Sequence, residues 1–226
     1  MILETTVFSI IQTIAVYAIP VLFAITVHEA AHGWMAGRLG DNTAAMLGRV
    51  TLNPLKHIDP VGTILMPLML YVATSGAFVF GYAKPVPVRF GHLRNPRWGT
   101  LWVALAGPLA NLAQALLWGV LLVLLKGLGV MEPFFLRMCQ AGMGVNVVMC
   151  VFNLFPVPPL DGGRVMVSLL PARPAIALSR LEPWGFFIVM ALLVTHVIDW
   201  LWMQPLMTLV FWVLDIVLYP LSALVR

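Results

Sequence analysis

The sequence HEAAH, residues 28–32, lies near the end of an apolar run that begins around Val7 and carries no other charged side chain. On a helix, positions i and i+4 lie on one face, so His28 and His32 can present two imidazoles to one metal ion. Glu29 then lies close enough to act on a metal-bound water, and H-E-x-x-H is the spacing of zinc hydrolases. The alternative is a histidine pair satisfied inside a helix bundle, but ionisable side chains within a bilayer are costly and usually functional.

The composition is typical of a membrane protein with several spans. Of the 226 residues, 61% are hydrophobic and 10% charged, and the mean hydropathy is +0.96, which a soluble domain of this size would not tolerate. The net charge of +4 comes from basic residues in short loops beside apolar stretches, which indicates membrane topology rather than a nucleic-acid partner. We expect a single domain over residues 1–226, with a motif-bearing core at about 7–164 and C-terminal helices at about 184–223.

Six apolar stretches are long enough to cross a bilayer, at about 7–37, 61–80, 99–125, 138–157, 184–203 and 205–223. If all six cross, the 13 Lys and Arg residues divide five and eight between the two sides. If the stretch 61–80 instead dips in and returns, eleven face the cytoplasm and only Lys126 and Arg137 lie outside, which the positive-inside rule favours. We therefore predict an all-α polytopic membrane protein with five to six transmembrane helices and a re-entrant segment.

A catalytic zinc site needs three protein ligands and one open position, so the two histidines require a further ligand. Among the remaining acidic residues, Asp161 has the most informative surroundings, in NLFPVPPLDGG at residues 153–163. The prolines of this segment prevent a helix from continuing, and unwound backbone is tolerated at membrane depth where it lines a cavity. We predict that Asp161 is the third ligand, with a turn or capping aspartate as the alternative. This ligand must share a membrane side with His32, which the re-entrant arrangement satisfies and six full crossings do not.

Two short segments are predicted as membrane-associated β-strands. Residues 43–53 contain Leu47, Val50 and Leu52 before a turn-like Asn-Pro pair, which is a weak strand pattern. Residues 84–90 begin with KPVPV, whose alternate prolines cannot donate to a ladder and confine such a strand to a sheet edge.

With these motifs, the chain resembles the site-2 protease family of intramembrane zinc metalloproteases, and in particular its compact bacterial type without a PDZ domain. The matching segments are HEAAHGWMAGRLGD, GRVTLNPLKHIDPVGT, GYAKPVPV, LRNPR, AGPLAN and NLFPVPPLDGG. They run from His28 to Gly163, and the chain beyond Gly163 carries no motif that matches the family.

The resemblance implies one Zn²⁺ per chain and a set of residues around it. The implied metal ligands are His28, His32 and Asp161. Glu29 would be the general base, and Asn153 and Asn111 would position the substrate or stabilise the oxyanion. For Asn111, which lies in AGPLAN, a hydrogen bond between helices of the bundle is the alternative.

The implied function is that of an intramembrane zinc endopeptidase that hydrolyses peptide bonds in or near transmembrane segments of membrane-protein substrates. The resemblance also implies a multi-pass protein of the bacterial cytoplasmic membrane, with the active site toward the cytoplasmic side. The alternative is a non-proteolytic metal-binding scaffold or carrier of the same fold. A pure metal site would not need Glu29, and a transporter would be expected to show repeated halves, which the sequence lacks. The sequence leaves open the roles of His196, Asp199 and Asp215, the substrate and the oligomeric state.

Overall fold

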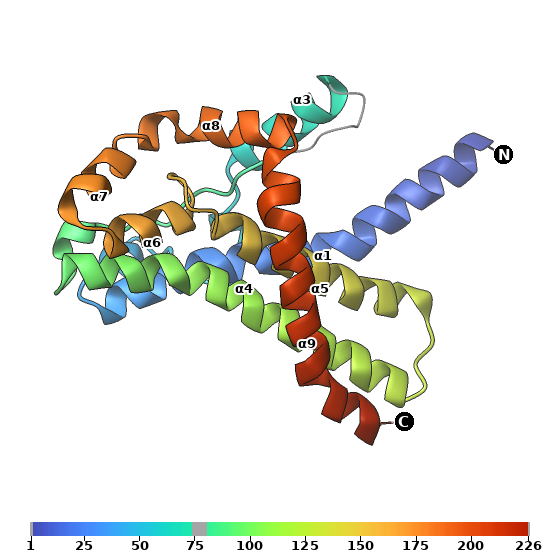
Figure 1. Ribbon diagram of the computed structural model, residues 1–226. Helices are drawn as coiled ribbons and strands as arrows, with labels where there is room; N and C mark the ends of the chain where they lie inside the picture. The colour runs from blue at the N-terminus through green and yellow to red at the C-terminus, as the bar shows by residue number, and fades with distance from the viewer. Residues whose placement is uncertain (1, 74–80, 226) are drawn as a thin grey trace.

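The computed structural model describes residues 2–73 and 81–225, and helices make up most of it (Figure 1). The α-helices are α1 (Ile2–Arg38), α2 (Thr43–Met46), α3 (Met66–Ala73), α4 (Pro96–Gly127), α5 (Pro133–Asn153), α6 (Asp161–Leu169), α7 (Ala172–Ser179), α8 (Glu182–Val194) and α9 (Gln204–Leu224). Short 3₁₀ turns lie at η1 (Pro54–Lys56) and η3 (Phe90–His92), and π-helical turns at η2 (Pro60–Leu65) and η4 (Asp199–Met203).

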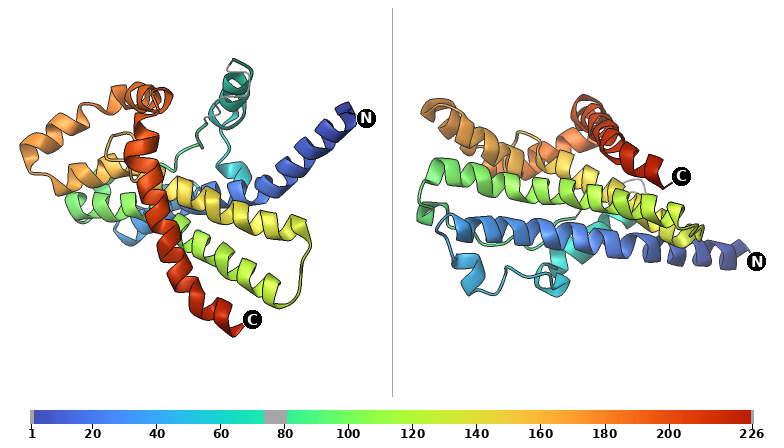
Figure 2. Two further views of the ribbon diagram at one scale, coloured as in Figure 1. Left: turned by 45° about the vertical axis from the view of Figure 1, so that its right-hand side comes forward. Right: turned by 90° about the horizontal axis from the view of Figure 1, so that it is seen from below.

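Three long helices, α1, α4 and α5, form the core of the bundle. Helices α1 and α4 lie side by side and run in opposite directions, and α5 packs against both (Figure 2). Helix α4 begins at Pro96, which has no N–H to leave unpaired, after Asn95, whose side chain accepts a hydrogen bond from the Trp98 N–H. The C-terminal end of α1, the N-terminal end of α4 and the C-terminal end of α5 therefore meet at one end of the core.

Helix α9 crosses α4 and α5 and covers them on one side (Figure 1). A buried apolar cluster joins the three helices and the turn before α9; it consists of Ala115, Val147, Val151, Ile198, Met203 and Leu214. The Trp202 indole N–H also donates to the Val151 carbonyl at 2.8 Å. These contacts fix the C-terminal half of α5, which leads directly to Asp161.

Within residues 2–73 and 81–225, four helices are long and apolar enough to cross a membrane, namely Ile11–Arg38, Pro96–Gly127, Pro133–Asn153 and Asp199–Leu224. Helices α7 and α8, which are bent by 70° relative to each other, add a fifth if they act as one span. The boundary between the last two predicted stretches, 184–203 and 205–223, lies earlier in the structure. Helix α8 ends at Val194, before His196, whose φ of 56° is incompatible with a continuing helix, and the last span begins at Asp199. The described residues therefore supply four to five spans, and the upper value agrees with five crossings in the predicted range of five to six.

The chain between α1 and α4 starts and finishes at the same end of the core. The Arg94 N–H donates to the Leu39 carbonyl at 2.9 Å, so the two ends of this connection are in contact. A re-entrant segment requires such a return. The predicted segment 61–80 begins with η2 and α3, but residues 74–80 lie outside the described residues, and the re-entrant path remains a prediction.

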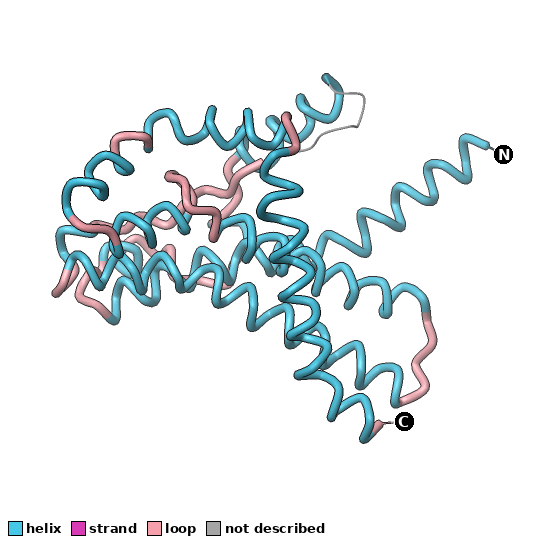
Figure 3. Tube along the Cα trace, in the orientation of Figure 1, coloured by secondary structure: helices cyan, strands magenta, loops and turns pink. Residues whose placement is uncertain are grey.

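Neither predicted β-strand forms, and no residue within 2–73 or 81–225 belongs to a strand (Figure 3). The strand over 43–53 is wrong, because the Asp41 carboxylate accepts the Thr43 N–H and hydroxyl and starts helix α2. The chain then turns at Gly48, which has a φ of 63°. Residues 84–89 lie outside any helix, and no neighbouring strand pairs with them in the described part of the chain.

Candidate metal centre

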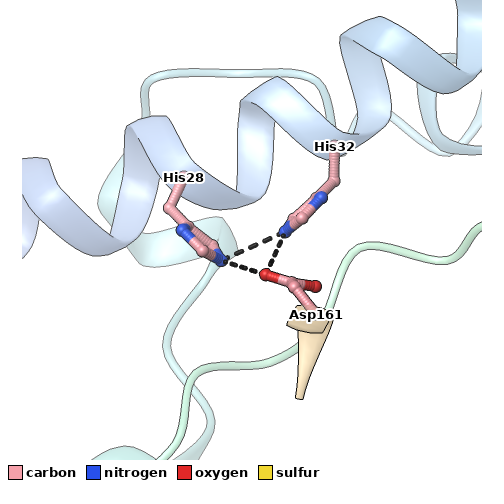
Figure 4. A group of neighbouring side chains, drawn as sticks. All are labelled: His28, His32 and Asp161. Carbon is pink, nitrogen blue, oxygen red and sulfur yellow. Dashed lines mark hydrogen bonds and ion pairs between the residues drawn. The ribbon is translucent and has the colours of Figure 1, made fainter. Parts of the chain in front are cut away.

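His28, His32 and Asp161 lie together at the end of the core where α1, α4 and α5 meet (Figure 4). The two histidine Nε2 atoms are 3.1 Å apart, and each lies 3.3 Å from Asp161 Oδ2. Tetrahedral zinc with bonds of 2.0–2.1 Å separates its ligand atoms by about 3.3–3.4 Å. Asp161 Oδ2 is also buried without a hydrogen-bond donor. The spacing and the orphaned carboxylate oxygen both fit a zinc ion.

The hydrogen bonds of the two histidines leave both Nε2 atoms free to bind metal. His32 Nδ1 lies 2.7 Å from the Val103 carbonyl oxygen, which can only accept, so Nδ1 carries the proton. His28 Nδ1 lies 2.6 Å from Asn111 Oδ1, which is likewise an acceptor. Both partners lie on α4. That helix can approach so closely because it carries Gly107 here, where a methyl group would overlap both imidazole rings.

Asp161 is positioned by the tight return of the chain after α5. Helix α5 ends at Asn153, and α6 begins at Asp161 itself. Gly162 and Gly163 pack against the backbone of the preceding loop so closely that any side chain would collide with it. The two glycines are therefore needed for this close approach and not for a left-handed backbone conformation.

Arg97, at the start of α4, holds the far end of α6. Its guanidinium donates to the carbonyls of Ser168 and Leu169 at 2.7 and 3.1 Å. Because these are among the last carbonyls of α6 and have no partner within the helix, the contact both caps α6 and fixes it to α4.

Glu29 is held by residues 84–89, which we call the strap. The Val86 N–H donates to Glu29 Oε2 at 2.8 Å. The Arg49 guanidinium donates to the Lys84 and Pro85 carbonyls at 2.9 and 3.3 Å and so fixes the beginning of the strap.

Asp41 fixes the end of the strap, where its Oδ2 accepts the Arg89 N–H at 2.6 Å. The Asp41 side chain is fully buried. Burial raises the pKa of this carboxyl, but hydrogen bonds from the Thr43 hydroxyl and from the N–H groups of Arg89 and Thr43 outweigh that effect and lower the pKa below its usual value. Asp41 is therefore a charged acceptor at neutral pH.

Two cavities meet at the metal group, and His28, Glu29, Asn153 and Leu160 line both. One cavity, of about 350 Å³, is also lined by polar residues, including His32, Asp161 and Arg164, and we call it the polar cavity. The other, of about 460 Å³, is walled by apolar side chains of α1 and α5, namely Val21, Ile25, Val145, Met149 and Phe152. A cavity of about 820 Å³ between the N-terminal half of α1 and helix α5 is lined by none of the candidate site residues.

The two predicted asparagines lie in different environments. Asn153 lines both cavities, and its amide nitrogen donates to the Met149 carbonyl at 3.0 Å. Asn111 is fully buried, and its amide nitrogen donates to the Ala24 carbonyl at 3.1 Å and to Asn146 Oδ1 at 2.9 Å. Asn111 thus makes the interhelical contacts that were the alternative to an oxyanion role.

Sequence reasoning missed Asn146, although an asparagine within an apolar span is a signal of interhelical hydrogen bonding. It also left His196 and Asp199 without a role. These two side chains form an exposed pair at 3.0 Å, three residues apart, far along the chain from the metal group.

Helices of membrane-spanning length that bring the two histidines of HExxH and a third potential ligand, an aspartate, to zinc spacing define a membrane-embedded zinc metalloprotease. The chain belongs to peptidase family M50, whose family model matches residues 16–143, more than half of its length. The resemblance to the site-2 proteases is therefore confirmed, and the protein is a zinc metalloprotease.

Several curated bacterial proteins are similar to this chain. "Putative zinc metalloprotease YwhC" of Bacillus subtilis is 37% identical over 186 residues, which cover 78% of this chain and 79% of that protein. "Putative zinc metalloprotease Rip2" of Mycolicibacterium smegmatis is 32% identical over 200 residues, covering 86% of this chain and 71% of that protein. The Mycobacterium tuberculosis protein of the same name is 28% identical with the same coverage. No solved structure matches the chain.

Proposed function

We propose that this protein is an intramembrane endopeptidase that cleaves peptide bonds in or near transmembrane segments of other membrane proteins. The observation that carries the proposal is the zinc-spaced group of His28, His32 and Asp161 at one end of three membrane-length helices. The alternative, a non-proteolytic metal scaffold, needs the three ligands but not the further carboxylate of Glu29. Glu29 lines both cavities and is oriented by a dedicated hydrogen bond, which favours the protease.

In this proposal, His28, His32 and Asp161 hold one Zn²⁺ per chain. When bound, zinc lowers the pKa of a water molecule toward neutrality and polarises the scissile carbonyl. The Glu29 carboxylate accepts the proton from that water and later delivers it to the leaving amine. The Val86 N–H donates a hydrogen bond to Glu29 Oε2 and so orients the Glu29 carboxylate for this proton transfer.

We assign the two asparagines to different tasks. Asn153 lines both cavities beside Glu29, and it has a second amide hydrogen besides the one donated to Met149, so it is the candidate for binding the substrate carbonyl. Asn111 faces neither cavity, and we assign to it the orientation of His28.

The strap offers an edge to which an unwound substrate can add. A helical substrate hides its carbonyls in its own hydrogen bonds and must unwind before cleavage. Val86 and Val88 line the polar cavity, and alternate residues of an extended chain direct their N–H and C=O groups to the same side. The Val88 N–H makes no hydrogen bond within the described part of the chain. Pro85 and Pro87 have no N–H, so only this side of the strap can accept a strand.

Accumulation of uncleaved stubs in cells tests the proposed function. Membrane proteomes of a strain with the active protein and a strain with Glu29→Gln are compared. We expect one or more membrane proteins to accumulate as short, membrane-retained fragments only in the variant strain. Identical membrane proteomes in the two strains would contradict the proposal.

Val88→Pro should weaken substrate binding, because it removes the N–H that strand addition requires. We expect the KM for a substrate found in that comparison to rise by roughly 2–10-fold, the worth of one hydrogen bond, with zinc content unchanged. Val88→Ala, which keeps the N–H and shortens the side chain, is the control. A rise in KM for Val88→Ala as large as that for Val88→Pro would assign the effect to side-chain contacts and would refute strand addition to the strap.

We propose that the active site faces the cytoplasm of a bacterial cell membrane. Single cysteines placed at the exposed positions Arg94 and Arg173 should then react with a membrane-impermeant thiol reagent from the cytoplasmic side. A cysteine at the exposed Met131, in the α4–α5 connection, should react from the opposite side. The native Cys139 and Cys150 are buried and give little background. Labelling of positions 94 and 173 from opposite sides would refute this topology.

A further inference from the structure

A chain of buried hydrogen bonds links the metal group to α5. His28 Nδ1 lies 2.6 Å from Asn111 Oδ1, and the Asn111 amide nitrogen donates to Asn146 Oδ1 at 2.9 Å. The Asn146 amide nitrogen donates in turn to the Gly142 carbonyl, also at 2.9 Å. Both asparagine side chains have an exposed fraction of zero, so no solvent is available to replace a missing partner.

Each link of this chain fixes the direction of the next. A backbone carbonyl only accepts, so Gly142 turns the amide nitrogen of Asn146 toward itself and leaves Asn146 Oδ1 facing Asn111. Asn146 Oδ1 and the Ala24 carbonyl then both require the amide nitrogen of Asn111. Asn111 Oδ1 is thereby directed at His28 Nδ1. A flipped Asn111 amide would place a donor there and favour the proton on Nε2, where it would block the metal.

We propose that Asn146 is a positioning residue for the metal site: it fixes the orientation of the Asn111 amide, and through it the His28 tautomer that can bind zinc. The inference rests on the proposed metal ligands. Groups that hold the outer nitrogen of a ligating histidine typically contribute 10–100-fold to metal affinity. Asn146 is one hydrogen bond further from the metal ligand. It acts through Asn111, the only side chain hydrogen-bonded to His28 Nδ1 among the described residues.

The test measures zinc affinity of the purified full-length protein by competition with a chelator. Asn146→Leu should bind zinc about 10-fold or more weakly, because the leucine accepts nothing from Asn111. The visible spectrum of the Co²⁺-substituted protein should change with it, since the spectrum reports ligand geometry. Asn146→Asp is the conservative variant, because a protonated aspartic acid can still accept from Asn111 and donate to Gly142. It should retain affinity within about threefold of the parent.

A matched control and a double variant separate positioning from general packing. Gln114 lies about one turn beyond Asn111 on α4. It is also buried, and its amide nitrogen has no hydrogen-bond partner. Gln114→Leu should leave zinc affinity unchanged. In an Asn111→Leu background, Asn146→Leu should cause no further loss, because its effect passes through Asn111.

Three outcomes would overturn the inference. They are parental zinc affinity in Asn146→Leu, equal losses in Asn146→Asp and Asn146→Leu, and additive losses in the double variant. If Asn146→Leu does not fold, the smaller Asn146→Ala takes its place with the same expected loss, because alanine also accepts nothing from Asn111. Absence of zinc binding by the parent protein would overturn the metal centre itself, a different result from parental affinity in the variants.

Discussion

Replacement of Glu29 by glutamine is expected to leave zinc bound and to lower the rate of proteolysis by about 10²–10⁴-fold, the usual contribution of one general base or acid. Glutamine has nearly the shape of glutamate, and its carbonyl oxygen can still accept the Val86 N–H. The strap should therefore stay in place. What the amide cannot do is accept a proton from water. Zinc content by elemental analysis and cleavage rate on the same preparation measure the two effects.

The control for Glu29→Gln is a carboxylate of similar size without a proposed role in proton transfer. Glu182→Gln serves, because Glu182 is about half exposed and pairs with Arg164 at 2.8 Å. Its activity should remain close to that of the parent. Equal activity in Glu29→Gln and the parent would remove the protease mechanism, whatever the zinc content.

Replacement of Asp161 by alanine is expected to abolish tight zinc binding. Two imidazoles would remain, and they come from one helical turn and cannot by themselves complete the three-ligand set of a catalytic site. The loss of affinity should exceed the 10–100-fold typical of residues that only support a ligand. Proteolysis should disappear with the metal and should not return on adding equimolar zinc.

Zinc retained per chain after dialysis against a chelator measures the effect of Asp161→Ala. Asp199→Ala is the matched control, because Asp199 also pairs with a histidine but lies exposed at the beginning of η4. It should retain zinc as the parent does. One zinc per chain in Asp161→Ala would assign the third ligand to another residue and refute the proposed centre.

The local part of the site could be predicted from the sequence because it follows from helix geometry. The i, i+4 spacing places His28 and His32 on one face wherever the helix lies, and their Nε2 atoms are 3.1 Å apart. Helix geometry alone does not predict that Asp161 approaches the histidines, since Asp161 lies far from them in sequence. Its proline-broken surroundings and the requirement for a third ligand predicted it, and the side chain does lie beside both imidazoles.

The parts that the sequence did not predict depend on packing between distant segments. The strap was expected to pair as a strand, but it is fixed by Arg49, Asp41 and Glu29, and side chains of this kind leave no periodic pattern. Hydropathy likewise could not place the end of α8 at Val194, because the chain turns at His196 within a run of apolar residues, and a turn of the backbone does not change hydropathy. Asn146 was missed because its partner lies on another helix.

The two cavities that meet at Glu29 have a consequence for how the reactants arrive. Hydrolysis consumes water and a peptide, and for a membrane-embedded peptide these have opposite solubilities. The polar cavity is lined by Arg164, which is partly exposed and pairs with Glu182, whereas the other cavity is walled by apolar side chains of two spanning helices. In the proposed function, water reaches Glu29 through the polar cavity, and the substrate passes from the apolar cavity to the strap. The proposed zinc-binding end of the bundle then stays hydrated without a water path through the lipid.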